Sequence, residues 1–126
     1  MVDERQPRIV EGVRLERGAR RGLPDDVALH DLAAGPVARR MGADRLVVAV
    51  LAPSDAPPVA IAARRRRDGE GVDAVLQPTI AKGARGDDVP WHCVLRLPEP
   101  VDAAAALAVR IRGLGDDVEV VAQPAG

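Results

Sequence analysis

The chain has 126 residues, of which 47 % are apolar and 29 % charged, which is the size and composition of one folded domain. Its 18 basic residues are offset by 19 acidic ones, so the net charge of −1 argues against nucleic acid or an acidic membrane as a general partner. No apolar run has the length of a membrane span or a secretory signal, and the single Cys93 cannot form an internal disulfide. We therefore expect one cytoplasmic domain over residues 1–126, with flexible ends at 1–8 and 123–126.

The N-terminal third predicts an edge strand followed by two short helical segments. Residues 9–17 alternate apolar with charged side chains, as a half-buried strand does, and residues 18–22 break the pattern as a loop. Good helix formers fill residues 27–34, and a Gly-Pro pair interrupts that helix. Residues 37–41 predict a further helical turn that ends at the next glycine.

The middle of the chain predicts a central strand and a hairpin. Residues 46–51 are a continuous apolar run of strand length, which is typical of a strand covered on both faces. Residues 59–67 and 72–80 flank the turn sequence of residues 68–71, whose glycines can adopt the positive φ angles of a tight hairpin. Pro78 cannot donate to a ladder, so we expect a sheet edge or a bulge there.

In the C-terminal third, the sequence pattern does not decide the secondary structure of one element. Residues 90–97 predict a strand, but residues 102–113 fit both a helix and a strand that would pair with residues 118–121. We favour the helix because four consecutive alanines have high helix propensity and low strand propensity. The expected fold is then α+β, a mostly antiparallel sheet with one or two helices packed on it. The alternative is an all-β sandwich.

The arginine run of residues 64–67 is the strongest local concentration of charge. On a strand, alternate side chains point to opposite faces, so Arg64 and Arg66 are expected to share one face. A salt-bridged or solvated hairpin is favoured over nucleic-acid binding, because the chain lacks the aromatic side chains on which bases stack. The acidic side chains close enough in sequence to neutralise the run are those of Asp68, Glu70 and Asp73.

Varied reactive groups cluster only between residues 87 and 93. Asp87, Asp88 and His92 are the polar candidates for a binding surface there. His92 and Cys93 are adjacent on a predicted strand, so they face opposite sides and cannot form a nucleophile and its base. Trp91 is either a core plug, which is favoured, or the wall of a pocket.

Metal and cofactor sites are not predicted. The two histidines and one cysteine have no ligand spacing typical of zinc, and His30 next to Asp31 is weak evidence because neighbours on a helix do not face one another. The glycine-containing loops lack the lysine and the strand-to-helix context of a phosphate-binding loop.

The sequence favours a non-enzymatic binding or protein-interaction module, such as an accessory subunit or small regulator. A protein partner or a second copy is expected, because the aromatic-poor core is weak and residues 61–63 and 72–76 are apolar on both faces. One alternative is a small enzyme built around His92 and Cys93, and a second is a nucleic-acid binder using residues 64–67. The candidate binding surface comprises Asp87, Asp88, Trp91, His92, Arg64 and Arg66.

Overall fold

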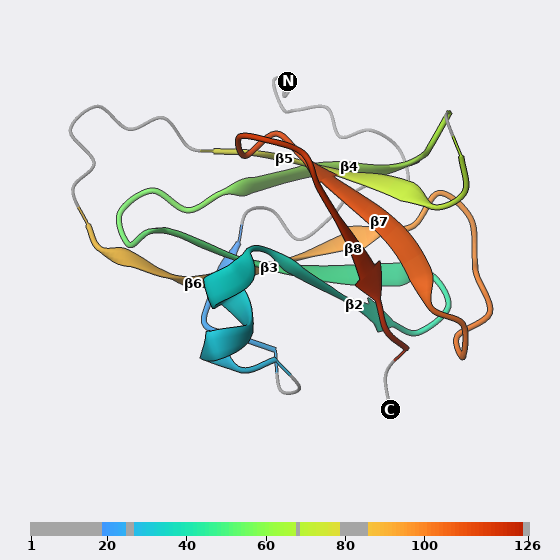
Figure 1. Ribbon diagram of the computed structural model, residues 1–126, viewed down its shortest axis with the longest axis horizontal. Helices are drawn as coiled ribbons and strands as arrows, with labels where there is room; N and C mark the ends of the chain where they lie inside the picture. Colours follow the sequence, from blue (N-terminus) through green and yellow to red (C-terminus); the bar gives the residue numbers. More distant parts are fainter. Residues whose placement is uncertain (1–18, 25–26, 68, 79–85, 125–126) are drawn as a thin grey trace, which may run out of the picture.

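A computed structural model describes residues 19–24, 27–67, 69–78 and 86–124. These residues form two four-stranded sheets that lie face to face (Figure 1). The first sheet has the strand order β1-β6-β3-β2 and the second β4-β5-β7-β8. The strands are β1 (Arg20–Arg21), β2 (Val37–Met41), β3 (Arg45–Pro53), β4 (Val59–Arg65), β5 (Val72–Gln77), β6 (Asp88–Arg96), β7 (Leu107–Arg112) and β8 (Val118–Ala122).

The α+β prediction is wrong. Within the described ranges the only helix is the short 3-10 helix η1 (Leu29–Ala34), and the architecture is close to the alternative, an all-β sandwich. The segment 102–113, favoured as a helix, contains strand β7, whose Leu107, Val109 and Ile111 are buried while the side chains between them face outward. The four alanines form only a turn after Asp102, and the residues that follow pair in parallel with β5 and antiparallel with β8 instead of continuing a helix.

The N-terminal predictions also need correction. The strand expected at residues 9–17 lies outside the described residues. The expected loop contains strand β1, which pairs with β6, and residues 37–41 form strand β2 rather than a helical turn. The helical segment is shorter than expected and ends at Gly35, whose φ of 135° is in the region that favours glycine. The following Pro36 prevents the helix from continuing, so the chain enters β2.

Three strand predictions are confirmed. β3 is an interior strand whose residues 46–50 are buried on both faces. β4 and β5 form the expected antiparallel hairpin, and Gly71 in its turn has a φ of 102°. A bulge lies in β4 between Ala60 and Ala62, and β5 ends at Gln77, directly before Pro78. β6 covers the strand that was expected from residue 90 onward.

The main core lies between the sheets and consists of aliphatic side chains, Cys93 and the indole of Trp91. Leu46, Leu76, Leu95 and Ile111 are its largest fully buried members, one from each of four strands. A smaller apolar cluster around Ala49 joins η1 to the outer side of the first sheet. Among the residues that the structure describes, no helix has the length and apolarity to cross a membrane.

One edge of the sandwich is closed by β2 and β8. Arg39 and Gln123 form a parallel bridge, and the Arg40 amide donates to the Gln123 carbonyl oxygen at 2.9 Å. Gln123, expected in a flexible end, is therefore part of the hydrogen-bonded fold.

The side chain of Arg40 ties this edge to the connection between β6 and β7. Its residue is 2 % exposed, and the guanidinium donates four hydrogen bonds of 2.6 to 3.0 Å to backbone carbonyl oxygens. The acceptors are the carbonyl groups of Gly42, Val101, Asp102 and Ala105. No helix forms at residues 101–105. The buried guanidinium of Arg40 holds this segment in place through its hydrogen bonds to the backbone carbonyl groups.

Candidate functional site

The reactive groups of residues 87–93 do not form one site. Side chains alternate along β6, so Trp91 and Cys93 point into the core while His92 lies on the outer side. Asp87 and Asp88 are exposed at the start of the strand. Asp88 and His92 are four positions apart, which is roughly 13 Å along a strand. Groups that are close in sequence here therefore lie on different faces of β6 or far apart along it.

Trp91 belongs to the core. Its residue is 8 % exposed, and its Nε1 donates to the carbonyl oxygens of Ala52 and Pro53, each at 3.3 Å. The Arg21 guanidinium carbon lies 5.5 Å from the ring centroid, within the range of a cation–π contact. This placement agrees with the core-plug interpretation and not with a pocket wall.

His92 and Cys93 face opposite sides of the first sheet, as expected. The His92 Nδ1 lies 3.0 Å from the Gly22 carbonyl oxygen, and Cys93 is buried. Burial raises the pKa of the Cys93 thiol to about 11, so the thiolate is scarce at neutral pH. These two residues cannot act as a nucleophile and its base.

His30 and Asp31 contact each other, contrary to the expectation for helix neighbours, with Nε2 and Oδ1 3.3 Å apart on the exposed 3-10 turn. In the described part of the chain, no three side chains of His, Cys, Asp or Glu lie close enough together to hold a metal ion.

The best-organised polar arrangement is on the outer side of the second sheet. Arg64 lies opposite Asp73 on β5, Asp73 opposite Arg110 on β7, and Arg110 opposite Glu119 on β8. One row of charges therefore crosses all four strands. Arg66 pairs with Glu119 on the same side, which confirms that Arg64 and Arg66 share a face. We call this surface the arginine face, and it comprises Arg64, Arg66, Asp73, Arg110, Arg112, Asp117 and Glu119.

Asp73 is the centre of the arginine face. Its carboxylate accepts two hydrogen bonds from Arg110, from Nε to Oδ1 at 2.8 Å and from Nη2 to Oδ2 at 3.1 Å. Arg112 adds a longer contact of 3.5 Å from Nη1 and pairs through Nε with Asp117 at 3.2 Å. The Arg66 Nη1 lies 3.2 Å from the Glu119 Oε1. The bidentate pair fixes the plane of the Arg110 guanidinium.

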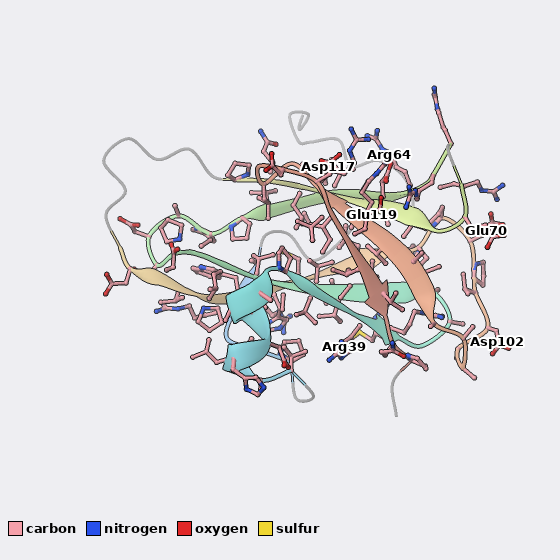
Figure 2. All side chains as sticks on the ribbon, viewed as in Figure 1. Arg39, Arg64, Glu70, Asp102, Asp117 and Glu119 are labelled. Carbon is pink, nitrogen blue, oxygen red and sulfur yellow. The ribbon has the colours of Figure 1, made fainter. Side chains whose placement is uncertain are left out.

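The charges of this face do not cancel. Four arginines stand against three carboxylates, a formal balance of one positive charge. The hydrogen bonds from Arg110 lower the pKa of Asp73, and the charges of Arg110 and Arg112 add to this, against the opposing effect of burial. Arg64 is exposed and makes no ion pair with any side chain of the described ranges. Figure 2 shows Arg64, Asp117 and Glu119 gathered on this side.

The lowered pKa of Asp73 makes a testable contribution to stability. Replacing Asp73 with Asn is expected to reduce the free energy of unfolding by about 2 kcal/mol at neutral pH, because charged hydrogen bonds are lost. The carboxyl group has a lower pKa folded than unfolded, so its contribution is complete above the unfolded pKa of about 3.9 and disappears as the pH falls through the folded value. The difference between wild type and D73N should therefore shrink below about pH 4.

Urea unfolding at a series of pH values measures this difference, and the exposed Asp117→Asn is the matched control, with an expected loss of about 0.5 kcal/mol or less. A difference between wild type and D73N that stays constant on acidification would contradict the proposed ion pair.

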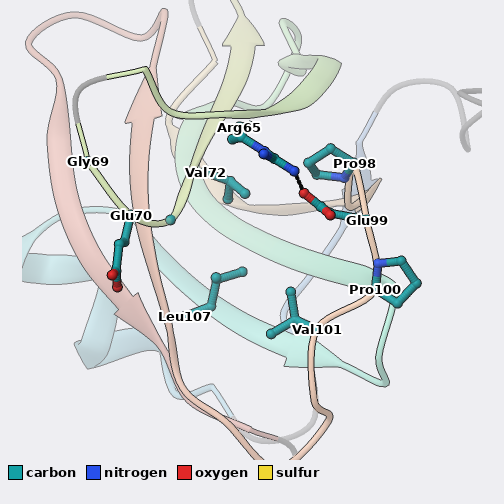
Figure 3. A pocket seen from close by; sticks show the side chains of 10 residues that line it. Arg65, Gly69, Glu70, Val72, Pro98, Glu99, Pro100, Val101 and Leu107 are labelled. Carbon is teal, nitrogen blue, oxygen red and sulfur yellow. Dashed lines mark ion pairs between the residues drawn. The ribbon is translucent and has the colours of Figure 1, made fainter.

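A pocket of about 350 Å³ lies beside the other side of the same hairpin (Figure 3). Arg65, between the two arginines of the face, points to this side and pairs with Glu99. The pocket has an apolar floor of Val72, Val101 and Leu107. The hairpin arginines therefore lie in two places: Arg64 and Arg66 on the arginine face, and Arg65 beside the pocket on the other side of β4.

Sequence reasoning found only part of the arginine face. It identified Arg64 and Arg66 by alternation but did not include Arg110 and Arg112 among the candidates. The signal was present, because both arginines alternate with buried residues if residues 107–112 are taken as a strand.

The fold and this surface together define a small all-β protein with two facing sheets, one of which displays an ordered row of charges. Comparison with protein-family models, with curated proteins and with solved structures finds no match to the chain.

Proposed function

We propose that this protein is a non-enzymatic protein-interaction module whose arginine face binds an acidic segment of a partner protein. The observation that carries the proposal is the strand register, which aligns Arg64, Asp73, Arg110 and Glu119 across the second sheet. The free Cys93 fits a reducing compartment, so we place the interaction in the cytoplasm.

The ordering of the arginines supports this proposal. Asp73 holds Arg110 and Arg112 in place, so less conformational entropy is lost when a partner carboxylate docks beside them. Arg64 offers a guanidinium that is exposed and not neutralised within the described residues. A chain with a net charge of −1 that presents a positive face can orient an approaching acidic surface.

A protein partner is favoured over nucleic acid and over a second copy. The only aromatic side chain, Trp91, is in the core, so no aromatic ring on this face can stack on bases. A second copy was expected to pack on residues 61–63 and 72–76. Ile61 is exposed there, but Arg64 and Asp73 lie opposite each other on the same hairpin, which favours a charged partner. A patterned mixture of charges is typical of surfaces that recognise a complementary protein.

Charge reversal at Arg64 tests the proposal. We expect a fluorescein-labelled oligoglutamate peptide to bind the wild-type protein and to bind Arg64→Glu at least about tenfold more weakly, because a like charge then faces the peptide. Fluorescence anisotropy at low and moderate salt measures both affinities. Arg45→Glu, an exposed arginine at the start of β3 in the other sheet, is the matched control and should change the affinity less than about twofold.

Equal peptide binding by wild type and Arg64→Glu would overturn the proposal. A single-stranded oligodeoxynucleotide with the same formal charge is the competing probe. If it binds the wild type more tightly than the peptide does, and loses that binding in Arg64→Glu, the arginine face serves nucleic acid instead.

A further inference from the structure

β4 is an end strand of the second sheet, and its outer edge is open. The strand order puts β5 on one side of β4 and no described strand on the other. The other end of the sandwich is closed, because β2 and β8 meet there through the hydrogen bond between Arg40 and Gln123. At seven residues, Val59–Arg65, β4 is long enough to pair with a further strand. An open edge of this kind is a template for another chain.

The backbone groups that face this edge follow from the register of the hairpin. The Arg66 amide donates to the Gly71 carbonyl oxygen, and in an antiparallel pair alternate residues direct their backbone groups toward the partner strand. Ala63 and Arg65 therefore direct their N–H and C=O groups to the open side. Among the described residues, neither has a backbone partner there. Ala63 is half-buried and Arg65 is exposed, so an extended segment can reach both.

The charges beside the edge favour an acidic segment. The row that crosses the second sheet alternates in sign, from Glu119 on β8 through Arg110 and Asp73 to Arg64 on β4. Opposite charges that lie directly across from each other on neighbouring strands are stabilising. Because the row ends in a positive charge at the open edge, a carboxylate on an added strand continues the alternation. A second copy of β4 offers the wrong charge, since this strand carries two arginines and no acidic residue.

We propose that the acidic segment of the partner protein binds as an extended strand along the open edge of β4, with an acidic side chain opposite Arg64. Hydrogen bonds to the backbone groups of Ala63 and Arg65 supply affinity, and the carboxylate supplies specificity. The four-stranded second sheet then gains a fifth strand. This inference rests on the proposed function and adds to it the conformation of the bound segment and the strand that receives it.

Backbone methylation of a peptide separates strand addition from charge attraction. The probe is a fluorescein-labelled peptide of alternating glutamate and threonine, and its matched control has the same sequence with N-methylated central amides. N-methylation keeps every charge and removes backbone donors. Each backbone hydrogen bond changes the affinity by a factor of about two to ten, so the methylated peptide should bind the full chain at least about tenfold more weakly. Fluorescence anisotropy measures both affinities.

Hydrogen exchange of single amides locates the bound peptide on the protein. In the free protein, the amides of Ala63 and Arg65 should exchange quickly, whereas those of Ala62 and Arg64, which face β5, should exchange slowly. With the unmethylated peptide at about ten times its dissociation constant, exchange at Ala63 and Arg65 should slow by about tenfold. Exchange at Ala62 and Arg64 should stay unchanged.

Three results would overturn this proposal. If the methylated peptide binds as tightly as its parent and Arg64→Glu weakens both, the arginine face binds acidic segments without an added strand, and only the proposed function stands. If neither peptide binds the wild-type protein, both proposals fail. If the amides of Ala63 and Arg65 already exchange slowly in the free protein, the edge is occupied by another segment of this chain or by a second copy.

Discussion

Replacing Arg40 with Met is expected to lower the free energy of unfolding by about 3 to 5 kcal/mol. Its guanidinium is buried and donates to four backbone carbonyl oxygens, and these acceptors stay in place when the side chain is removed. A methionine has a similar length but no donors. Each acceptor left without a partner costs about 1 to 3 kcal/mol if water does not reach it.

Urea unfolding of the Arg40→Met and Arg45→Met variants measures this effect. Arg45 is exposed on the neighbouring strand, so its replacement should change stability by less than about 0.5 kcal/mol. If Arg40→Met lies within that range as well, the guanidinium does not hold residues 101–105 to β2.

Replacing Trp91 with Ala is expected to cost about 3 to 5 kcal/mol, the second large effect. The indole is the only aromatic ring in the core, so its loss leaves a cavity that small neighbours cannot fill. Two carbonyl oxygens, those of Ala52 and Pro53, also lose their donor. Trp91→Phe separates the loss of packing from the loss of the hydrogen bonds. It keeps most of the apolar area and should cost about 1 to 2 kcal/mol.

Fluorescence gives a second measurement of Trp91, since no tyrosine or other tryptophan contributes. A residue that is 8 % exposed should emit at shorter wavelength than free tryptophan and be quenched poorly by acrylamide. Emission like that of free tryptophan, together with an unaltered stability of Trp91→Ala, would place the indole outside the core.

The strands with strong local signals were predictable from sequence, and the fold class was not. Residues 46–51 and the hairpin of β4 and β5 carry their patterns within a few residues. The pattern of residues 107–112 fits both a helix and a strand, and the four alanines that precede it favour a helix. What decides in the folded chain is pairing with β5, a parallel contact that no local propensity encodes.

The same limit applies to the arginine face. Alternation was enough to place Arg64 and Arg66 together and Arg65 apart. The principal partners of Asp73 are Arg110 and Arg112, which are far along the chain, so neighbours in sequence could not identify them. Asp88, Trp91 and His92 were grouped as candidates because they are close in sequence, whereas β6 directs Trp91 into the core and His92 to the outer side.

The proposal that the arginine face is the binding surface has one most direct test. Backbone amide chemical shifts are recorded while the oligoglutamate peptide is added to the wild-type protein and to Arg64→Glu. The account predicts shifts at Arg64, Asp73, Arg110 and Glu119 and at their neighbours on β4, β5, β7 and β8, with much smaller shifts in the variant. Shifts centred on β3 and β6 of the first sheet, or equal shifts in both proteins, would contradict it.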